Sequence, residues 1–416
     1  MCRFLVYKGT EPIQLSHLVT RPRHSIINQA FESKLRFPSS RPMNADGFGI
    51  GWYDPYADAT APPIIPNPTG TLAPPSPSHE QPFAPSPGSL LSSPAESDAA
   101  EAAELDEQKS AELLRLREEE RVMESERPCL FKSISPAWSN ANLTRLAEKI
   151  RSPLVFAHVR ASTIPGAPSE DNCHPWIFDR LMWMHNGEIN EFKKIKRALQ
   201  ASLPEELFLY PSGYTDSEWA FMVFLSKLKD PHSRCFSHVE LRTAMLETIQ
   251  VINKLSKEAG VTGPSLMNFV VTDGETVVAT RQVFNCACLT LADFASNRYI
   301  SSRTSEASSL FFSSGTSFDE YQDGGLYRMT KADKRENIIM IASEPLTFER
   351  SDWMEVKTNM MVVVTNKMNL LQIPIIDEYW VPPKDPLSHL RNKDFAIAKG
   401  FGHGFASTSF GEVLVA

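Results

Sequence analysis

Residues 1–12 read MCRFLVYKGTEP, so a cysteine directly follows the initiator methionine and precedes an alternating apolar pattern. This pattern predicts a strand over residues 3–8. Because Cys2 is small, we expect ordinary removal of Met1, which leaves a thiol and a free α-amino group on one residue. Such an amine has a pKa of roughly 7.7–8.0, so at neutral pH it can accept the thiol proton, directly or through water. A small buried cysteine at the start of a strand is the alternative interpretation.

The segment 57–127 differs in composition from the rest of the 416-residue chain. Of the 31 prolines, 12 lie between Pro55 and Pro94, and the run after residue 96 is strongly charged. The segment has a net charge of −9 against −8 for the whole chain, so the body is nearly neutral. We expect a disordered first half and at most a solvated helix in the second. A near-neutral body without a basic run does not suit nucleic-acid binding.

Six cysteines are scattered along the chain without a C-x-x-C pair, which argues against a zinc knuckle or a disulfide framework. This distribution suits a reducing compartment. The first residues lack the pattern of a secretory signal, and no run approaches the ~20 apolar residues of a membrane span. We therefore expect a soluble cytoplasmic protein that contacts no membrane and holds no metal.

Outside 57–127, short β-branched and aromatic runs predict strands, and apolar residues at spacings of three and four predict helices. The predicted strands are 3–8, 49–53, 153–160, 181–185, 267–272, 276–281, 337–343 and 361–365, and the predicted helices are 143–150, 189–199, 217–229 and 239–258. Asp273-Gly274 predicts a hairpin. Strands joined mostly by hairpins, with helices in pairs, favour an α+β layered fold over a parallel doubly wound sheet.

Three further segments carry residues suited to chemistry. Arg160 ends the apolar run of FAHVRAST (156–163), where its planar fork of donors could grip a carboxylate; an ordinary surface arginine is the alternative. Asn186-Gly187 predicts a turn that closes the strand 181–185, and its amide and N–H could stabilise an oxyanion; a plain turn is the alternative. Thr215-Asp216-Ser217-Glu218 precedes an apolar helix and has the pattern of a helix N-cap.

In this order the segments resemble the class II glutamine amidotransferase domain, an N-terminal-nucleophile hydrolase with an αββα sandwich. That family carries an N-terminal Cys, then H-x-R-x-x-T, N-x-H-P, H-N-G and T/S-D-[ST]-E. The matching residues here are Cys2, then His158, Arg160 and Thr163, then Asn172, His174 and Pro175, then His185, Asn186 and Gly187, and finally Thr215, Asp216, Ser217 and Glu218.

The resemblance implies a role for each of seven residues and calls for no cofactor. Cys2 is the nucleophile and its own amine is the base. Arg160 binds the α-carboxylate of the substrate, and Asp216 binds its α-amino group. The Asn186 side chain and the Gly187 N–H form the oxyanion hole. Thr163 and His174 line the substrate pocket.

Within this family, the chain resembles most a stand-alone branch that includes the fungal amidotransferase subunit of cytosolic glutathione degradation. It is carried by residues 1–31, RPMNADGFGIGWY (41–53), SSLFFSSGTSFDEY (308–321) and IASEPL (341–346). The branch implies the γ-glutamyl amide bond of glutathione as the target and a peptidase-like protein as partner. Nothing after residue 346 resembles an ammonia-consuming domain, so we expect hydrolysis. The alternatives are a glutaminase subunit that donates ammonia to a separate synthase chain, and a non-catalytic binding scaffold with the same fold.

The expected organisation is one discontinuous domain, 2–56 with 128–380, interrupted by the insert 57–127 and followed by a tail, 381–416. Residues 282–298, which include Cys286 and Cys288, interrupt the similarity and are either a lineage-specific loop or a translated intron. Asp46-Gly47-Phe48-Gly49 is either a tight bend or a place where backbones approach closely beside the pocket.

Overall fold

The structure is a computed structural model, and it describes residues 2–35, 43–55, 112–116, 122, 125–161, 169–261, 263, 265–284, 308–332 and 336–376. The chain divides into two compact units, Met1–Tyr56 with Arg127–Ala416, and Ala57–Glu126, and each is described by itself. Thr163, Cys286, Cys288 and the tail 381–416 lie outside the described residues.

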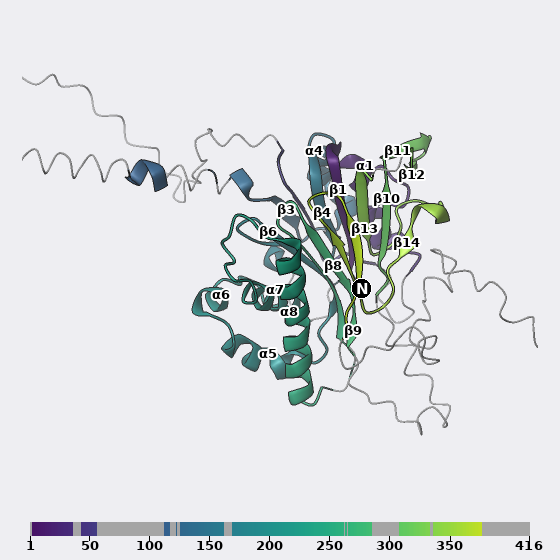
Figure 1. Cartoon of the computed structure of the whole chain (residues 1–416). Coiled ribbons are helices and arrows are strands. Elements are labelled where there is room, and N and C mark those ends of the chain that lie inside the picture. Colours follow the sequence, from purple (N-terminus) through teal and green to yellow (C-terminus); the bar gives the residue numbers. More distant parts are fainter. Residues whose placement is uncertain are drawn as a thin grey trace, which may run out of the picture. The chain divides into compact units, whose positions relative to one another are not determined.

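In the described part of the larger unit, seven strands form a first sheet in which every neighbouring pair is antiparallel. The spatial order is β14-β10-β13-β1-β4-β2-β3. Their bounds are β1 Arg3–Gln14, β2 Phe48–Trp52, β3 Cys129–Ser133, β4 Arg151–Val159, β10 Phe311–Gly315, β13 Ile338–Ala342 and β14 Met354–Glu355. The N-terminal strand β1 therefore lies at the centre of the sheet, with a neighbour on each side (Figure 1).

The second sheet has the order β16-β15-β8-β7-β6-β5, with the short strand β9 also paired to β7, and it is again antiparallel. Its strands are β5 Trp176–Phe178, β6 Leu181–Glu188, β7 Ser265–Thr272, β8 Val277–Arg281, β9 Val283–Phe284, β15 Met360–Val364 and β16 Leu370–Pro374. A separate hairpin is formed by β11 Ser317–Gln322 and β12 Leu326–Thr330.

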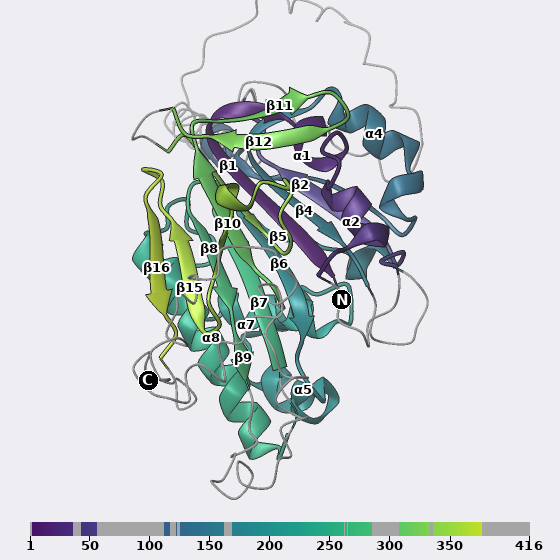
Figure 2. The same ribbon diagram turned by 90° about the vertical axis from the view of Figure 1, so that its right-hand side faces the viewer.

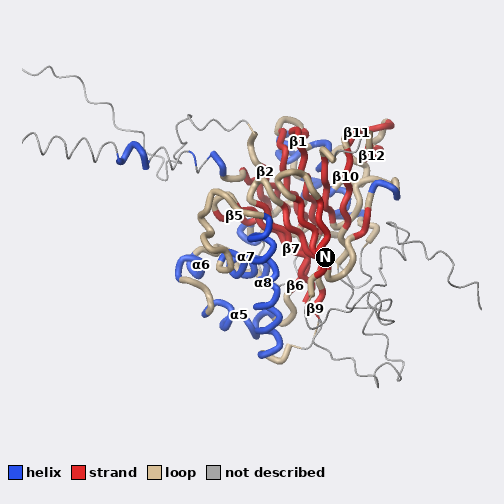
Figure 3. Tube along the Cα trace, viewed as in Figure 1, coloured by secondary structure: helices blue, strands red, loops and turns tan. Residues whose placement is uncertain are grey.

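Helices cover the outer faces of both sheets, so the layers run helix, sheet, sheet, helix (Figure 2 and Figure 3). Helices α1 Ser16–Val19, α2 Ile26–Glu32 and α4 Ala141–Ala147 lie on the first sheet, and α5 Phe192–Ala201, α6 Glu205–Leu209, α7 Asp216–Leu225 and α8 His238–Glu258 lie on the second. The 3-10 helices are η1 Ala137–Ser139, η2 Glu170–Asn172 and η3 Arg350–Asp352.

The alternation of side chains along the strands explains the three apolar layers. In β1, Leu5 and Tyr7 pack toward the helices, whereas Phe4 and Val6 pack between the two sheets. Even-numbered residues of β6, such as Met184, meet them from the second sheet. Successive strand residues point to opposite faces, so both faces of each sheet are buried. The predicted αββα sandwich is confirmed.

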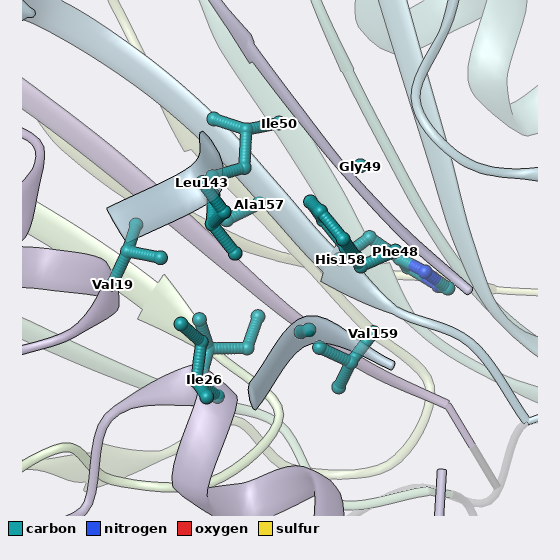
Figure 4. Close-up of a pocket in the computed structure, with 11 residues that line it drawn as sticks. Val19, Ile26, Phe48, Gly49, Ile50, Leu143, Ala157, His158 and Val159 are labelled. Carbon is teal, nitrogen blue, oxygen red and sulfur yellow. The ribbon is translucent and has the colours of Figure 1, made fainter. Parts of the chain in front are cut away.

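A small apolar cavity lies between the first sheet and its helices (Figure 4). Its volume is about 10 Å³, and its walls include Val19, Ile26, Phe48, Leu143 and Val159. This space is large enough for about one water molecule, but of the residues that line it only His158 has a polar side chain, whereas a bound water needs about two to four polar partners. We interpret the cavity as a packing gap and not as a binding site.

The predicted central strands and helices are present, with shifted ends. The hairpin at Asp273-Gly274 is confirmed: Thr272 pairs with Val277, Gly274 has φ +91°, and Asp273 Oδ1 accepts from the Glu275 and Thr276 N–H groups. The predicted helix 217–229 ends at Leu225, and the predicted helix 189–199 begins at Phe192.

The prediction that Asn186-Gly187 forms a turn is wrong. Both residues belong to β6, where Asn186 pairs with Asn268 and Gly187 pairs with Met267. The glycine is required for a different reason. A methyl group on Gly187 would lie 1.8 Å from the Leu266 carbonyl oxygen, so only glycine lets the two backbones approach this closely.

In the smaller unit, residues 112–116 are helical and their leucines are exposed, in accord with a solvated helix. The predicted disorder of the Pro/Ser-rich part falls on residues outside the described ranges. Among the described residues, no helix is both long enough and apolar enough to cross a membrane.

Candidate active site

A small pocket lies where five segments meet: the start of β1, the end of β4, the residues before β5, the end of β6 and the first turn of α7. It is lined by Cys2, Arg160, Ala161, Asn172, His174, His185, Gly187, Thr215, Asp216 and Ser217. Five of the seven residues selected from the sequence are thus brought together. Asn186 directly precedes Gly187 but is not in the lining, and Thr163 lies outside the described residues.

Cys2 is 9% exposed, and its thiol contacts the backbone that follows β4. The Ala161 N–H donates to Cys2 Sγ at 3.3 Å, and the thiol lies 3.5 Å from the Ala161 carbonyl oxygen. The Cys2 carbonyl accepts from Arg3 Nη1 at 2.9 Å. The residue before β1 is therefore anchored at its side chain and at its carbonyl group.

Arg160 directly follows β4 and is 6% exposed. Its backbone N–H donates to the Gly47 carbonyl at 2.8 Å, and Nη1 donates to the Asp46 carbonyl at 3.4 Å. Gly47 has φ +108°, and a methyl group there would lie 2.7 Å from Cys173 Sγ. Both interpretations of the Asp46–Gly49 segment hold, because Gly47 bends the chain and Gly49 packs against the His174 backbone. This bend supports the arginine in the pocket.

Asp216 occupies the first turn of α7, and Thr215 is the N-cap, as its sequence pattern predicts. Thr215 Oγ1 accepts from the Glu218 N–H at 3.3 Å. Asp216 Oδ2 accepts from the Ile189 N–H at 2.7 Å, and Oδ1 accepts from the Ser217 N–H at 2.9 Å. The carboxylate is thus oriented by backbone donors and still lines the pocket.

Asn186 faces the layer between the sheets and is fully buried. Its Nδ2 donates to Ser343 Oγ at 2.9 Å, whereas its Oδ1 has no partner among the described residues. A primary amide carries two N–H groups on one nitrogen. The bond to Ser343 fixes the plane of the amide and leaves its second N–H for another acceptor.

Two buried neutral histidines, His174 and His185, line the pocket, and a third, His158, packs against His174. Burial lowers the pKa of His158 to about 3, and it lowers the pKa of His174 and of His185. His185 Nε2–H donates to the Leu266 carbonyl, so Nδ1 accepts from the Ser217 hydroxyl at 2.8 Å. His158 Nε2–H donates across the sheets to the His185 carbonyl at 3.2 Å. The rings of His158 and His174 stack with centroids 3.9 Å apart.

Glu218 supports the wall of the pocket from the last position of the T-D-S-E motif. It accepts from the Ser212 and Gly213 N–H groups at 3.1 and 2.9 Å. Burial raises the pKa of Glu218 to about 7, although these two bonds oppose the rise. Asn172, which lines the pocket, accepts from the next N–H, that of Tyr214, at 3.1 Å. The loop before α7 is therefore held by two motif residues.

Comparisons with known proteins identify the family. A family model described as "Glutamine amidotransferases class-II" matches residues 126–300. The chain is 42% identical over 410 residues to "Probable glutamine amidotransferase DUG3" of Saccharomyces cerevisiae, which covers 96% of this chain and 90% of that protein. The chain belongs to the class II glutamine amidotransferases.

The chain is also similar to two solved structures. A glutamine aminotransferase class-II domain protein from Silicibacter pomeroyi gives a TM-score of 0.46 at 18% identity, covering 90% of this chain and 99% of that chain. Glutamine phosphoribosylpyrophosphate amidotransferase from Bacillus subtilis, complexed with ADP and GMP, gives a TM-score of 0.41 at 11% identity, covering 90% of this chain and 49% of that chain.

Sequence reasoning assigned no role to several residues that support this amidotransferase site. Asn172, His185 and Ser217 lie within the family motifs and line the pocket. Ser343 and Glu344 belong to the segment IASEPL (341–346), but their contacts with the N-terminal strand have no local sequence signal. In the described ranges, no three His, Cys, Asp or Glu side chains cluster so that they could hold a metal ion.

Proposed function

We propose that this amidotransferase is a cysteine amidohydrolase that cleaves the γ-glutamyl amide bond of glutathione. It would act as the amidotransferase-like subunit of a cytosolic complex with a peptidase-like partner. The observation that supports the reaction best is the convergence of the Cys2 thiol, the Arg160 guanidinium and the Asp216 carboxylate on one pocket.

The positive charge of Arg160 and the negative charge of Asp216 match the two charged groups at the glutamyl end of the substrate. Arg160 offers a planar fork of donors to the α-carboxylate, and the acidic side chain of Asp216 offers acceptors to the α-ammonium group. Both side chains are nearly buried, where charge-assisted hydrogen bonds are strong. Together they orient the substrate so that its γ-carbonyl carbon lies toward Cys2.

In the first step, the Cys2 sulfur attacks the γ-carbonyl carbon of the substrate and forms a C–S bond. The thiol proton passes to the α-amine of Cys2, which is free once Met1 has been removed. Negative charge then develops on the carbonyl oxygen. The Gly187 N–H and the second N–H of Asn186 are the donors assigned to that charge, and such a donor is worth about 10²–10³ in kcat.

Collapse of the tetrahedral intermediate breaks the C–N bond and returns the proton from the α-amine to the leaving nitrogen. The leaving group is the dipeptide Cys-Gly from glutathione, or ammonia from glutamine. Water then attacks the thioester on Cys2, again with the α-amine as base, and glutamate is released. No oxidant, reductant or cofactor is needed for either half of the reaction.

Arg160 and Asp216 recognise groups that glutathione and glutamine share, so the choice between them depends on the leaving-group side. We favour glutathione because residues 1–31, 308–321 and 341–346 resemble the glutathione-degrading branch. The described parts of these segments lie together in the structure, since β1 pairs with β13 and β13 pairs with β10. A partner that lines the mouth of the pocket would complete the specificity.

The test compares kcat/KM for glutathione and for glutamine, with the chain alone and with the complex isolated from its native source. A Cys2→Ala chain prepared in the same way is the control for contaminating peptidases. We expect Cys2-dependent release of glutamate and Cys-Gly. Robust glutamine hydrolysis beside undetectable glutathione cleavage would support an ammonia donor instead. Inactivity on both, with an intact Cys2 terminus, would support a scaffold.

A further inference from the structure

Ser343 and Glu344 directly follow β13 and lie beside the first residues of β1. Ala342 pairs with Leu5 across the two strands. Beyond that pair, the Ser343 N–H donates to the Phe4 carbonyl and the Phe4 N–H donates to Ser343 Oγ, both at 3.0 Å. These two residues are therefore the structural neighbours of the N-terminus although they lie near the other end of the domain.

Glu344 is a carboxylate with no exposed surface. Burial alone would raise its pKa, but the hydrogen bond from His24 and the charge of Arg3 outweigh burial and lower the pKa to about 2. A buried charge is tolerated only where partners compensate for its lost hydration. Four donors do so here: Arg3 Nε at 3.2 Å, His24 Nε2 at 2.8 Å, Ser33 Oγ at 2.7 Å and the Lys34 N–H.

Arg3 connects this carboxylate to the nucleophile. Its guanidinium is 2% exposed, and while Nε donates to Glu344, Nη1 donates to the Cys2 carbonyl at 2.9 Å. Nη2 donates to Ser33 Oγ and to the Leu35 carbonyl at 2.7 and 3.1 Å. Chain termini fray unless they are held. A rigid fork that is fixed at three corners holds the peptide plane from which the thiol and the α-amine of Cys2 project.

Ser343 contacts Asn186, the side chain that is proposed to stabilise the oxyanion. Its hydroxyl oxygen lies 2.9 Å from Asn186 Nδ2 and is itself fixed by the Phe4 N–H. Through Ser343, the amide of Asn186 is therefore held in a fixed position relative to β1, the strand that follows Cys2. A change at Ser343 would free this amide to rotate about its χ2 angle, which is a soft torsion.

We propose that Ser343 and Glu344 are positioning residues for the reaction of Cys2. Glu344 acts through Arg3 on the backbone of the nucleophile, and Ser343 acts on the amide of Asn186. The inference rests on the proposed role of Cys2 as nucleophile. Neither residue lies in the lining of the pocket, so substrate affinity is left to Arg160 and Asp216.

The test uses Glu344→Gln and Ser343→Ala in the full chain, with matched controls elsewhere in the core. Glu355→Gln removes the charge from another buried ion pair, Arg281 Nη1 to Glu355 Oε1 at 2.8 Å. Ser313→Ala removes a buried serine hydroxyl from β10 of the first sheet. Intact mass must show that each chain begins at Cys2.

Two readouts separate positioning from stability. One is kcat and KM for glutamine. The other is the rate at which 6-diazo-5-oxo-L-norleucine, a reactive glutamine analogue, modifies Cys2. We expect Glu344→Gln and Ser343→Ala to lower kcat and the maximal rate of modification by about 10- to 100-fold, because displacements of about 1 Å have such effects. KM and the analogue concentration for half-maximal rate should stay within about threefold, and both controls should keep wild-type kcat.

Arg3→Lys keeps the inference testable if Glu344→Gln does not fold. Lysine retains the charge opposite Glu344 but has no planar fork to hold the Cys2 carbonyl at the same time. It should fold and show the same loss of kcat at unchanged KM. If Arg3→Lys and Ser343→Ala both keep the wild-type kcat, this inference is wrong, whereas the proposed function still stands. Absence of Cys2 modification, and of turnover of both glutathione and glutamine, in the wild-type chain and in its complex would overturn the proposed function, and this inference with it.

Discussion

The carboxylate of Asp216 accepts a 2.7 Å hydrogen bond from the backbone N–H of Ile189, the residue that follows β6. This bond joins the first turn of α7 to the strand that carries Asn186 and Gly187. The acidic group proposed for the substrate ammonium is therefore held at a fixed distance from the groups proposed for the oxyanion. A substitution can therefore remove the charge of Asp216 and still keep this hydrogen bond to Ile189.

Asp216→Asn is the substitution that makes this separation. The asparagine oxygen can still accept from the Ile189 N–H, so the fold should persist, but the negative charge opposite the α-ammonium group is lost. A hydrogen bond to a charged group is worth about 1.5–3 kcal/mol, so we expect KM to rise by about 10- to 150-fold with kcat changed much less. Steady-state kinetics with glutamine or glutathione measures the split. A loss confined to kcat would assign Asp216 to the chemical step.

Retention of Met1 should abolish turnover, because the α-nitrogen of Cys2 then forms a peptide bond and cannot act as base. A chain with one residue fused ahead of Cys2 should fold normally and remain inactive until that residue is removed by a specific protease. Intact mass and activity are measured on the same sample before and after cleavage. A fully active preparation that carries Met1 would rule out the α-amine mechanism.

Asn186→Ala should lower kcat by about 10²–10³, since it removes one donor to the developing oxyanion. KM should change little, because the ground-state carbonyl has less charge to stabilise. Asn268→Ala is the control, since Asn268 pairs with Asn186 across β6 and β7 and is equally buried. A rise in KM with kcat intact would place Asn186 in substrate binding instead.

Local patterns predicted the strands and helices of an α+β layered fold, whereas the αββα order and the roles of the pocket residues, His174 among them, came from the resemblance to the class II glutamine amidotransferases. Strands rich in β-branched residues and motifs at their ends are visible in short windows. Gly187 shows where such windows fail. Asn-Gly is a strong signature of a turn, but here a backbone 79 residues further along the chain, at Leu266, requires the glycine. The roles of Arg3 and Glu344 depend in the same way on a contact between distant segments, and α1 and α2 are too short for periodicity to reveal them.

His158 should make the protein less stable in mild acid. Burial lowers its folded pKa to about 3, below the value of about 6.5 in the unfolded chain. Its contribution to stability is therefore complete above pH 6.5 and is lost as the pH falls toward 3, since only the unfolded chain takes up the proton. His158→Gln removes this dependence. Relative to wild type, the variant should gain about 2 kcal/mol between pH 7.5 and pH 5 in urea unfolding.

His232 is the control for this pH effect, because its shift has the opposite sign. Partial burial would lower its pKa, but hydrogen bonds with Asp179 and Glu206 outweigh burial and raise it. Its contribution is present below pH 6.5 and is lost as the pH rises through the folded pKa. His232→Gln should therefore lose stability relative to wild type as the pH falls. Parallel pH profiles for both variants would contradict the assignment of a buried neutral His158.

Deletion of 57–126 should leave kcat and KM unchanged. The two strands that flank this segment, β2 and β3, pair with each other, and Trp52 lies opposite Cys129 at the junction. After the deletion, residues 53–56 joined to 127–128 form a six-residue loop across this pair, which is slightly longer than the usual hairpin loop of about 2–5 residues but common for connections between elements. Arg127 is kept because it donates to Asp179 at 2.8 Å.

The physical reason is that the deleted segment contributes little to the core of the larger unit. Its sequence is poor in apolar residues and strongly acidic, and long surface insertions cost little closure entropy. The deleted chain should unfold at a urea concentration close to that of the full chain and hydrolyse substrate at the same rate. A folded deletion variant that has lost catalysis would show that the segment contributes to the site. Loss of activity only in the complex would show that the segment is needed for the interaction with the partner.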